Sequence, residues 1–167
     1  MKLLLSLLLA VFLFPVSASA LQPGDSLVII NKSSNKLAFI KDNKVQQIYP
    51  AGTGKSDDLT PEGLFTVKVK AVDPYYRKKD IPGGDPRNPL GTRWIGFDAK
   101  GTDGRIYGIH GTNDPSSVGK HISHGCVRLL KENIETLYEL VPIGTKVLIT
   151  KSSKDFQSIG RQYGAIQ

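Results

Sequence analysis

The residue types best suited to chemistry lie close together in one part of the chain. Cys126 is the only cysteine, and the three histidines, His110, His121 and His124, all precede it within a short stretch. A thiol with a pKa of about 8.5 is mostly protonated at neutral pH, and it becomes a strong nucleophile when an imidazolium, a helix N-terminus or a metal stabilises the thiolate. The pattern therefore predicts a cysteine nucleophile activated by a histidine.

Two neighbouring features favour attack on a carbonyl. His110 ends an apolar run that is typical of a strand, where a rigid element would hold a general base in place. Gly125 directly precedes Cys126 and permits a positive φ or a close backbone approach. The amides of Gly125 and Cys126 could then converge on a developing oxyanion. A carbonyl attacked by Cys126 would find hydrogen-bond donors already in place.

The elements that must position these residues are mainly β. Three short apolar runs separated by polar turns predict an antiparallel meander over residues 27–30, 37–40 and 45–49. Further strand patterns cover residues 64–69, 94–97, 105–110 and 145–150, and the Asp103-Gly104 pair is placed as a hairpin turn would place it.

One helix is predicted over residues 131–141. Its apolar residues follow a 3.6-residue repeat, and Pro142 and Gly144 then end it; these residues are Ile134, Leu137, Tyr138 and Val141. Residues 151–167 are polar with scattered apolar side chains, which predicts a loosely held polar C-terminal tail.

Two long loops interrupt the strands. Residues 73–92 hold four prolines and three glycines, and loops of this length are more often lids or binding walls than plain connectors. Tyr75 and Tyr76 favour a wall, because aromatic side chains on a loop need something to pack on. Residues 111–125 form the second loop, which leads into Cys126.

The ordered motifs resemble those of a known family. His110 followed by the run from Ser123 to Arg128, SHGCVR, resembles the signature of the L,D-transpeptidase (YkuD-like) catalytic domains of bacterial cell-wall enzymes. Three further blocks occur in the family's order: GTGKS at 52–56, TPEGLF at 60–65 and HGT at 110–112. The resemblance covers a catalytic domain over residues 26–150. It implies a mainly β fold, a β-sandwich of mixed sheets with one or two short helices.

The resemblance also implies roles for single residues. Cys126 would be the nucleophile and His110 the base, with the main-chain carbonyl of Gly111 orienting the imidazole. Ser123, His124 and Gly125 would shape the motif, the oxyanion site and the pocket. Arg128 would contact a substrate carboxylate or brace the loop, and Tyr107 would take part in substrate binding.

The reaction implied is acyl transfer on peptidoglycan stem peptides, with no cofactor. The thiolate would attack the carbonyl of the third residue, a diamino acid such as meso-diaminopimelate, and expel the terminal D-alanine. An amine from a neighbouring stem would then resolve the thioester and form a 3→3 cross-link. Water in place of the amine would make the same site an L,D-carboxypeptidase, and the sequence leaves that partition open.

Composition and targeting signals agree with an exported single domain. The chain has 167 residues, and its single cysteine excludes a disulfide framework within the chain. Its net charge of +7 favours anionic partners such as cell-wall polymers. Residues 1–20 read as a signal peptide, with basic Lys2, an apolar run and a small-x-small site ending at Ala20. That run is shorter than the ~20 residues of a membrane span, although an uncleaved anchor is the alternative. We expect a monomer without nucleic-acid binding, in the cell wall or an equivalent extracytoplasmic space.

Three other interpretations compete with this one. A zinc site could use the histidines, Cys126 and Asp114, but no glutamate stands where a zinc peptidase needs its base. In a papain-like endopeptidase the cysteine precedes its histidine, and here His110 comes first. A non-catalytic wall-binding module, with Cys126 an inert thiol, would keep the fold without the activity.

Overall fold

The computed structural model describes residues 20–167, so the signal segment predicted for residues 1–20 lies outside the described residues except for Ala20. The strands in this part are β1 (Leu27–Asn31), β2 (Lys36–Lys41), β3 (Lys44–Pro50), β4 (Thr53–Gly54), β5 (Gly63–Val72), β6 (Arg93–Phe97), β7 (Tyr107–His110), β8 (His121–Ser123), β9 (Val127–Arg128) and β10 (Lys146–Thr150). The helices are α1 (Lys131–Leu140) and α2 (Phe156–Gln162), with 3-10 turns η1 (Arg77–Lys79), η2 (Ala99–Gly101) and η3 (Pro115–Ser117).

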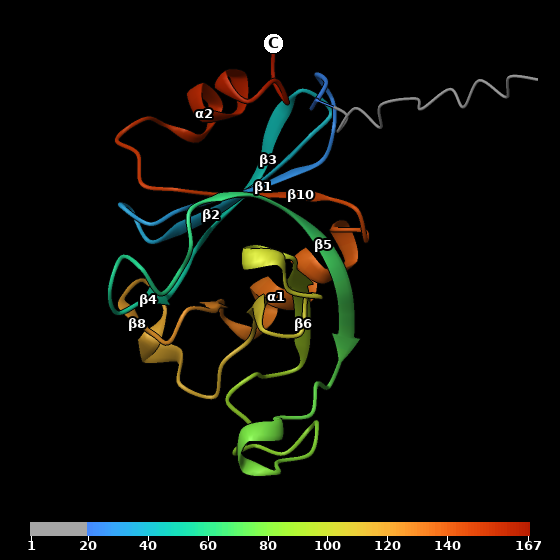
Figure 1. Cartoon of the computed structure of the whole chain (residues 1–167), viewed down its shortest axis with the longest axis vertical. Helices are drawn as coiled ribbons and strands as arrows, with labels where there is room; N and C mark the ends of the chain where they lie inside the picture. The colour runs from blue at the N-terminus through green and yellow to red at the C-terminus, as the bar shows by residue number, and fades with distance from the viewer. Residues whose placement is uncertain (1–19) are drawn as a thin grey trace, which may run out of the picture.

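A single curled, mixed sheet forms the body of the molecule. Its strand order is β3-β2-β1-β10-β5-β6-β7-β9, and β4 and β8 form a separate parallel pair. The long strand β5 pairs with β10 through its first residues and with β6 through its last, with an irregularity between Val67 and Val69. Such irregularities bend a strand. Figure 1 shows β5 arcing from the β1–β10 half towards β6. The two layers of the expected sandwich are therefore two halves of one continuous sheet.

Two hydrophobic cores lie on opposite faces of β1. Side chains alternate along a strand, and all five residues of β1 are buried. Val28 and Ile30 belong to the main core, which α1 closes with Ile134, Leu137 and the adjacent Val141. Leu27 and Ile29 belong to a second core beneath α2. A strand covered on both faces reads as a continuous apolar run, as the LVII segment does.

Most of the predicted elements are confirmed. The meander is β1-β2-β3, and the last strand is β10, which pairs in parallel with β1. The strands predicted around Asp103-Gly104 pair as β6 and β7, but β7 begins only at Tyr107, and the connection contains η2 instead of a two-residue turn. The predicted helix is α1, and the chain turns away at Pro142. Neither α1 nor α2, the α-helices of residues 20–167, has the length and apolar character that a membrane span requires.

The C-terminal segment differs from the loosely held tail that the sequence pattern predicts. Asp155 caps α2 by accepting a hydrogen bond from the Ser158 amide at 2.7 Å, and Phe156 and Ile159 are buried one turn apart. The helix covers the outer face of β1 and β2, which would otherwise expose apolar side chains. Seven residues are too few for helical periodicity to stand out from a polar background.

We therefore expect Ile159→Ala to lower the free energy of unfolding by about 2–4 kcal/mol, because it empties a packed position in the second core. Gln157→Ala, on the exposed side of the same helix, should change it by less than about 0.5 kcal/mol. Urea denaturation of both variants measures the difference. Equal stabilities would show that α2 is not held against the sheet.

Candidate active site

The sheet register brings Cys126 and His110 to one face. β7 and β9 are parallel, with Ile109 opposite Val127 and His110 opposite Arg128. Ile109 and Val127 point into the main core. Because side chains alternate along strands, His110 and Cys126, which immediately precedes β9, point to the other face. The predicted nucleophile and base therefore lie diagonally across two paired strands.

His110 is held in one orientation and one tautomer. Its Nδ1 lies 2.6 Å from the Gly111 carbonyl oxygen, and the side chain is buried. A carbonyl can only accept, so Nδ1 carries the hydrogen and Nε2 of the neutral ring is left as an acceptor. The main-chain role expected for Gly111 matches this contact. The arrangement suits a general base.

Trp94 supports the imidazole and was not predicted from the sequence. It lies opposite His110 on β6, and the two rings stack with centroids 5.6 Å apart. The Trp94 Nε1 donates to the Gly104 carbonyl at 2.9 Å. A Cβ on Gly108 would lie 2.6 Å from the indole, so only glycine fits beneath it. The predicted turn could not reveal this contact, because a two-residue turn at Asp103-Gly104 would place Phe97 opposite His110. The observed connection contains η2 and shifts the pairing by three residues, which brings Trp94 to that place.

A tight turn presents Cys126. The Ser123 hydroxyl donates to the Cys126 carbonyl at 2.6 Å and accepts from the Gly125 amide at 3.0 Å. Gly125 has a φ of 132°, and a Cβ there would lie 2.6 Å from the Leu59 carbonyl oxygen. The Gly125 amide is thus already engaged by Ser123, which differs from the expected pair of oxyanion donors. The Cys126 amide is the remaining candidate of the two.

Thr60 ties this turn to the rest of the domain. Its hydroxyl donates to the Gly125 carbonyl and accepts from the Gly54 amide, both at 2.9 Å. The loop that carries Thr60 is itself fixed by Lys32, which is 3% exposed and donates to the main-chain carbonyls of Asp57 and Thr60. The segment around Thr60 stands out in the sequence only through resemblance, and these contacts give it a physical role.

Burial favours the neutral forms of both Cys126 and His110. Burial lowers the pKa of His110 from 6.5 to about 4, and the positive charge of Arg128 adds to this, against main-chain contacts that raise it. Burial also raises the pKa of the Cys126 thiol, while the Gly108 main chain and the charges of Lys78 and Arg128 oppose the rise. These two pKa directions favour a neutral thiol beside a neutral imidazole over the thiolate and imidazolium that the sequence predicts.

A cavity of about 330 Å³ opens beside the sulfur, within the size range of small-ligand sites. Cys126 is partly exposed in its wall, and its Sγ contacts the Ile106 carbonyl at 3.4 Å. The lining residues are Val69, Ala71, Pro74, Tyr75, Tyr76, Arg77, Lys78, Leu90, Trp94, Arg105, Ile106 and Cys126.

The long loop of residues 73–92 contributes much of this lining, as the binding-wall prediction requires. Its shape is fixed by Asn88, which is buried and donates to the carbonyls of Pro74 at 2.8 Å and Pro82 at 3.1 Å. Tyr75 and Tyr76 both line the cavity. The loop is thus an ordered wall, with its packing supplied by one buried amide side chain.

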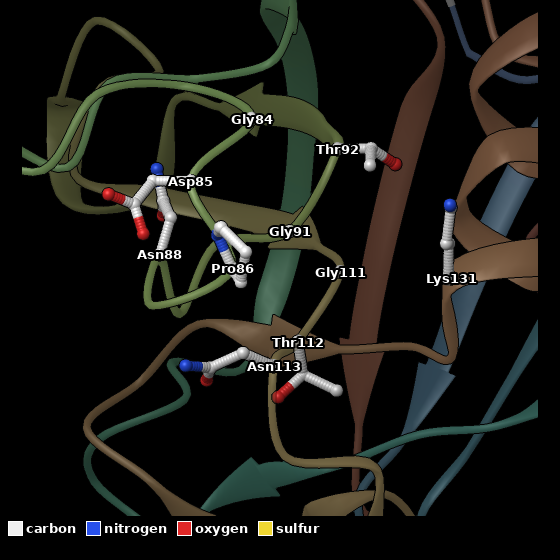
Figure 2. A pocket seen from close by; sticks show the side chains of 10 residues that line it. All are labelled: Gly84, Asp85, Pro86, Asn88, Gly91, Thr92, Gly111, Thr112, Asn113 and Lys131. Atoms are coloured by element: carbon white, nitrogen blue, oxygen red, sulfur yellow. The ribbon is translucent and has the colours of Figure 1, made fainter.

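A smaller cavity of about 170 Å³ lies against the Gly111 side of the site (Figure 2). Figure 2 shows its walls, the loop from Gly84 to Gly91 on one side and Gly111 with Thr112 on the other. Gly91 touches Gly111 so closely that a Cβ at Gly91 would lie 2.8 Å from the Gly111 Cα. The long loop therefore packs directly on the residue that orients His110.

The other predicted site residues lie outside the 330 Å³ cavity. His124 is exposed, and Tyr107 packs against the main core. Arg128 pairs with Gly52 through its main chain, and its buried Nε has no hydrogen-bond partner in the described part of the chain.

The residues of the zinc alternative are dispersed. His121 lies on β8, where its Nδ1 contacts the Thr53 hydroxyl at 3.0 Å. Within residues 20–167, no group of three or more His, Cys, Asp or Glu is placed to hold a metal ion.

We expect acid to destabilise the fold through His110. The unfolded histidine takes a proton near pH 6.5 and the buried one near pH 4, so the stabilisation is complete above pH 6.5 and is lost as the pH falls through this window. The wild type should lose about 3 kcal/mol more than His110→Gln between pH 7 and pH 4. Urea unfolding between pH 7 and pH 4 measures how the free energy of unfolding depends on pH. His121→Gln, at an exposed histidine, is the control and should keep the wild-type slope of this free energy against pH. An identical slope in His110→Gln would contradict a buried neutral imidazole.

Thr60→Val should lower the free energy of unfolding by about 2 kcal/mol or more, because the Gly54 amide and the Gly125 carbonyl both lose a buried partner. Thr60→Ser keeps the hydroxyl and should lower the free energy of unfolding by a clearly smaller amount. Chemical denaturation of the two variants compares them. If serine were as damaging as valine, the hydroxyl would not be the stabilising group.

Comparison with known proteins agrees with this geometry. The family model described as the YkuD L,D-transpeptidase catalytic domain matches residues 25–149. The Bacillus subtilis (strain 168) protein YqjB, whose name places it among the L,D-transpeptidases, is 59% identical over 144 residues, covering 86% of this chain and 82% of YqjB. Escherichia coli (strain K12) YbiS, similarly named, is 46% identical over 138 residues, which are 72% of this chain and 43% of YbiS.

Solved structures share the fold. The Ldtfm–avibactam carbamoyl enzyme superposes with a TM-score of 0.59 at 26% identity, over 77% of this chain and 49% of that one. A cysteine-to-serine variant of the Enterococcus faecium L,D-transpeptidase superposes with the same TM-score of 0.59 at 24% identity, over 76% of this chain and 50% of its own. With the family model spanning most of its length, this chain belongs to the YkuD family of L,D-transpeptidase catalytic domains.

Proposed function

We propose that the protein is a cysteine-dependent L,D-transpeptidase that joins peptidoglycan stems through 3→3 cross-links. The observation that carries the proposal is that the oriented His110 lies on the same sheet face as Cys126, and that Cys126 lines a cavity of about 330 Å³ together with Trp94, which stacks on His110. Membership of the family supports peptidoglycan stem peptides as the substrate class, and the proposed donor among them is the tetrapeptide stem. No cofactor is needed, because the cleaved peptide bond supplies the free energy of the new one.

Acylation begins from the neutral pair. As Sγ attacks the carbonyl carbon of the third stem residue, the thiol proton passes to Nε2 of His110. The Cys126 amide is the candidate donor to the oxyanion that forms. When the tetrahedral intermediate collapses, the peptide C–N bond breaks and His110 returns the proton to the departing D-alanine amine. A thioester between Cys126 and the tripeptide stem remains.

Deacylation reverses these roles. An amine of a neighbouring stem attacks the thioester carbon and gives a proton to His110, and a new amide bond replaces the C–S bond. The proton then returns to the sulfur, which restores the neutral pair. Attack by water would instead release a tripeptide, so the same acyl-enzyme can give L,D-carboxypeptidase activity.

The proposal places the protein outside the cytoplasm, where its substrate is. The signal segment predicted for residues 1–20 would export it, and the net charge of +7 would attract it to anionic wall polymers.

Incubation with a disaccharide tetrapeptide should add to Cys126 the mass of the disaccharide tripeptide acyl group, which is the substrate without its terminal D-alanine, as measured by mass spectrometry of the intact and digested protein. Cys126→Ala should abolish the adduct, and His110→Gln should slow D-alanine release by about 10³-fold or more, since each removes one member of a unit that acts together. His121→Gln, a histidine away from the cavity, should keep the wild-type rate.

Two outcomes would contradict the proposal. A wild-type protein that binds the stem without forming an adduct would be a wall-binding module, and an adduct on any other residue would remove Cys126 from its role. The ratio of cross-linked dimer to free tripeptide in the same reaction measures the partition between transpeptidase and carboxypeptidase.

A further inference from the structure

The charged side chains lining the cavity beside Cys126 are all cationic. They are Arg77 and Lys78 of η1 and Arg105 of the turn before β7. No aspartate or glutamate is among the lining residues. The remaining walls are apolar or aromatic, so these three charges dominate the electrostatics of the cavity.

The acidic residues nearby compensate this charge only in part. Arg105 forms an exposed ion pair with Asp103. Asp80 accepts a hydrogen bond from the Tyr75 hydroxyl. Arg77 and Lys78 form none of the ion pairs found within residues 20–167. The cavity therefore keeps two cations without an ionic partner.

The charge of Lys78 acts at the reacting centre. It lowers the pKa of the Cys126 thiol, against the effect of burial. A charge that stabilises the thiolate also acts on any charged group of a substrate bound at the sulfur.

On the proposed reaction, Cys126 attacks the carbonyl of the third stem residue, so that residue's side chain must lie within a few bonds of the sulfur. A diaminopimelate side chain ends in an ammonium and a carboxylate, with no net charge. Amidation of the carboxylate, or lysine in the same place, leaves only the ammonium. That single positive charge would face Arg77, Lys78 and Arg105.

We infer that this cationic cavity selects donor stems whose third residue keeps a free side-chain carboxylate. The inference rests on the proposed function and narrows its substrate class from diamino acids in general to those with an ionised side-chain carboxylate. The terminal D-alanine carboxylate is present in every donor, so it does not account for a preference among them.

Three tetrapeptide donors test the inference, each ending in D-alanine. Their third residues are meso-diaminopimelate, the same residue amidated on its side-chain carboxylate, and L-lysine. The mature protein should acylate the free-carboxylate donor with kcat/KM about five- to tenfold above the other two, and the ratio should shrink as salt screens the charges. Equal rates, or faster reaction of the amidated donor, would overturn the inference while leaving the proposed function intact. Failure to acylate with all three would overturn both.

Neutralising variants locate the source of the preference. Lys78→Gln and Arg77→Gln should each lower the ratio between free and amidated donors, mainly by raising KM for the free-carboxylate donor. Lys79→Gln is the matched control, because Lys79 belongs to η1 but does not line the cavity, and it should keep the wild-type ratio. A ratio unchanged in both cavity variants would overturn the assignment to these cations.

Discussion

The hydrogen bond between His110 Nδ1 and the Gly111 carbonyl is the constraint on which the site depends. It spans only one residue, so the backbone that ends β7 also sets the tautomer of the ring. Trp94 prevents the ring from turning, and Gly91 presses the long loop onto Gly111. The end of β7, the Trp94 indole and the contact between Gly91 and Gly111 together hold the imidazole so that its Nε2 remains available as an acceptor.

Burial decides how this geometry works. An imidazole in an aqueous loop would be partly protonated near neutral pH, whereas this one stays neutral down to about pH 4. The thiol beside the cavity is held protonated by the same effect. In the proposed reaction, proton transfer and attack on the carbonyl would therefore be coupled, because burial disfavours the charged form of each group.

The sequence was sufficient for the β meander, the β6–β7 hairpin and α1, because their apolar spacing is periodic over enough residues to be recognised. Cys126 and His110 were predicted as a reacting pair from their residue types and from the family motif, and the register of β7 and β9 places both on one face of the sheet. The contact between Ser123 and the Gly125 amide, the stacking of Trp94 and the neutral resting state depend on burial and on residues far apart in sequence. Helix α2 was missed because its few buried residues are scattered among polar ones.

The raised pKa of Cys126 has a consequence for the lifetime of the protein. Cysteine reacts with peroxides and disulfides chiefly as the thiolate, which attacks them as a nucleophile, so a thiol that stays protonated is oxidised slowly. This chain has no second cysteine that could trap a sulfenic acid as an internal disulfide. On the proposed function, a sulfur that stays protonated between turnovers would be protected against irreversible oxidation outside the cytoplasm.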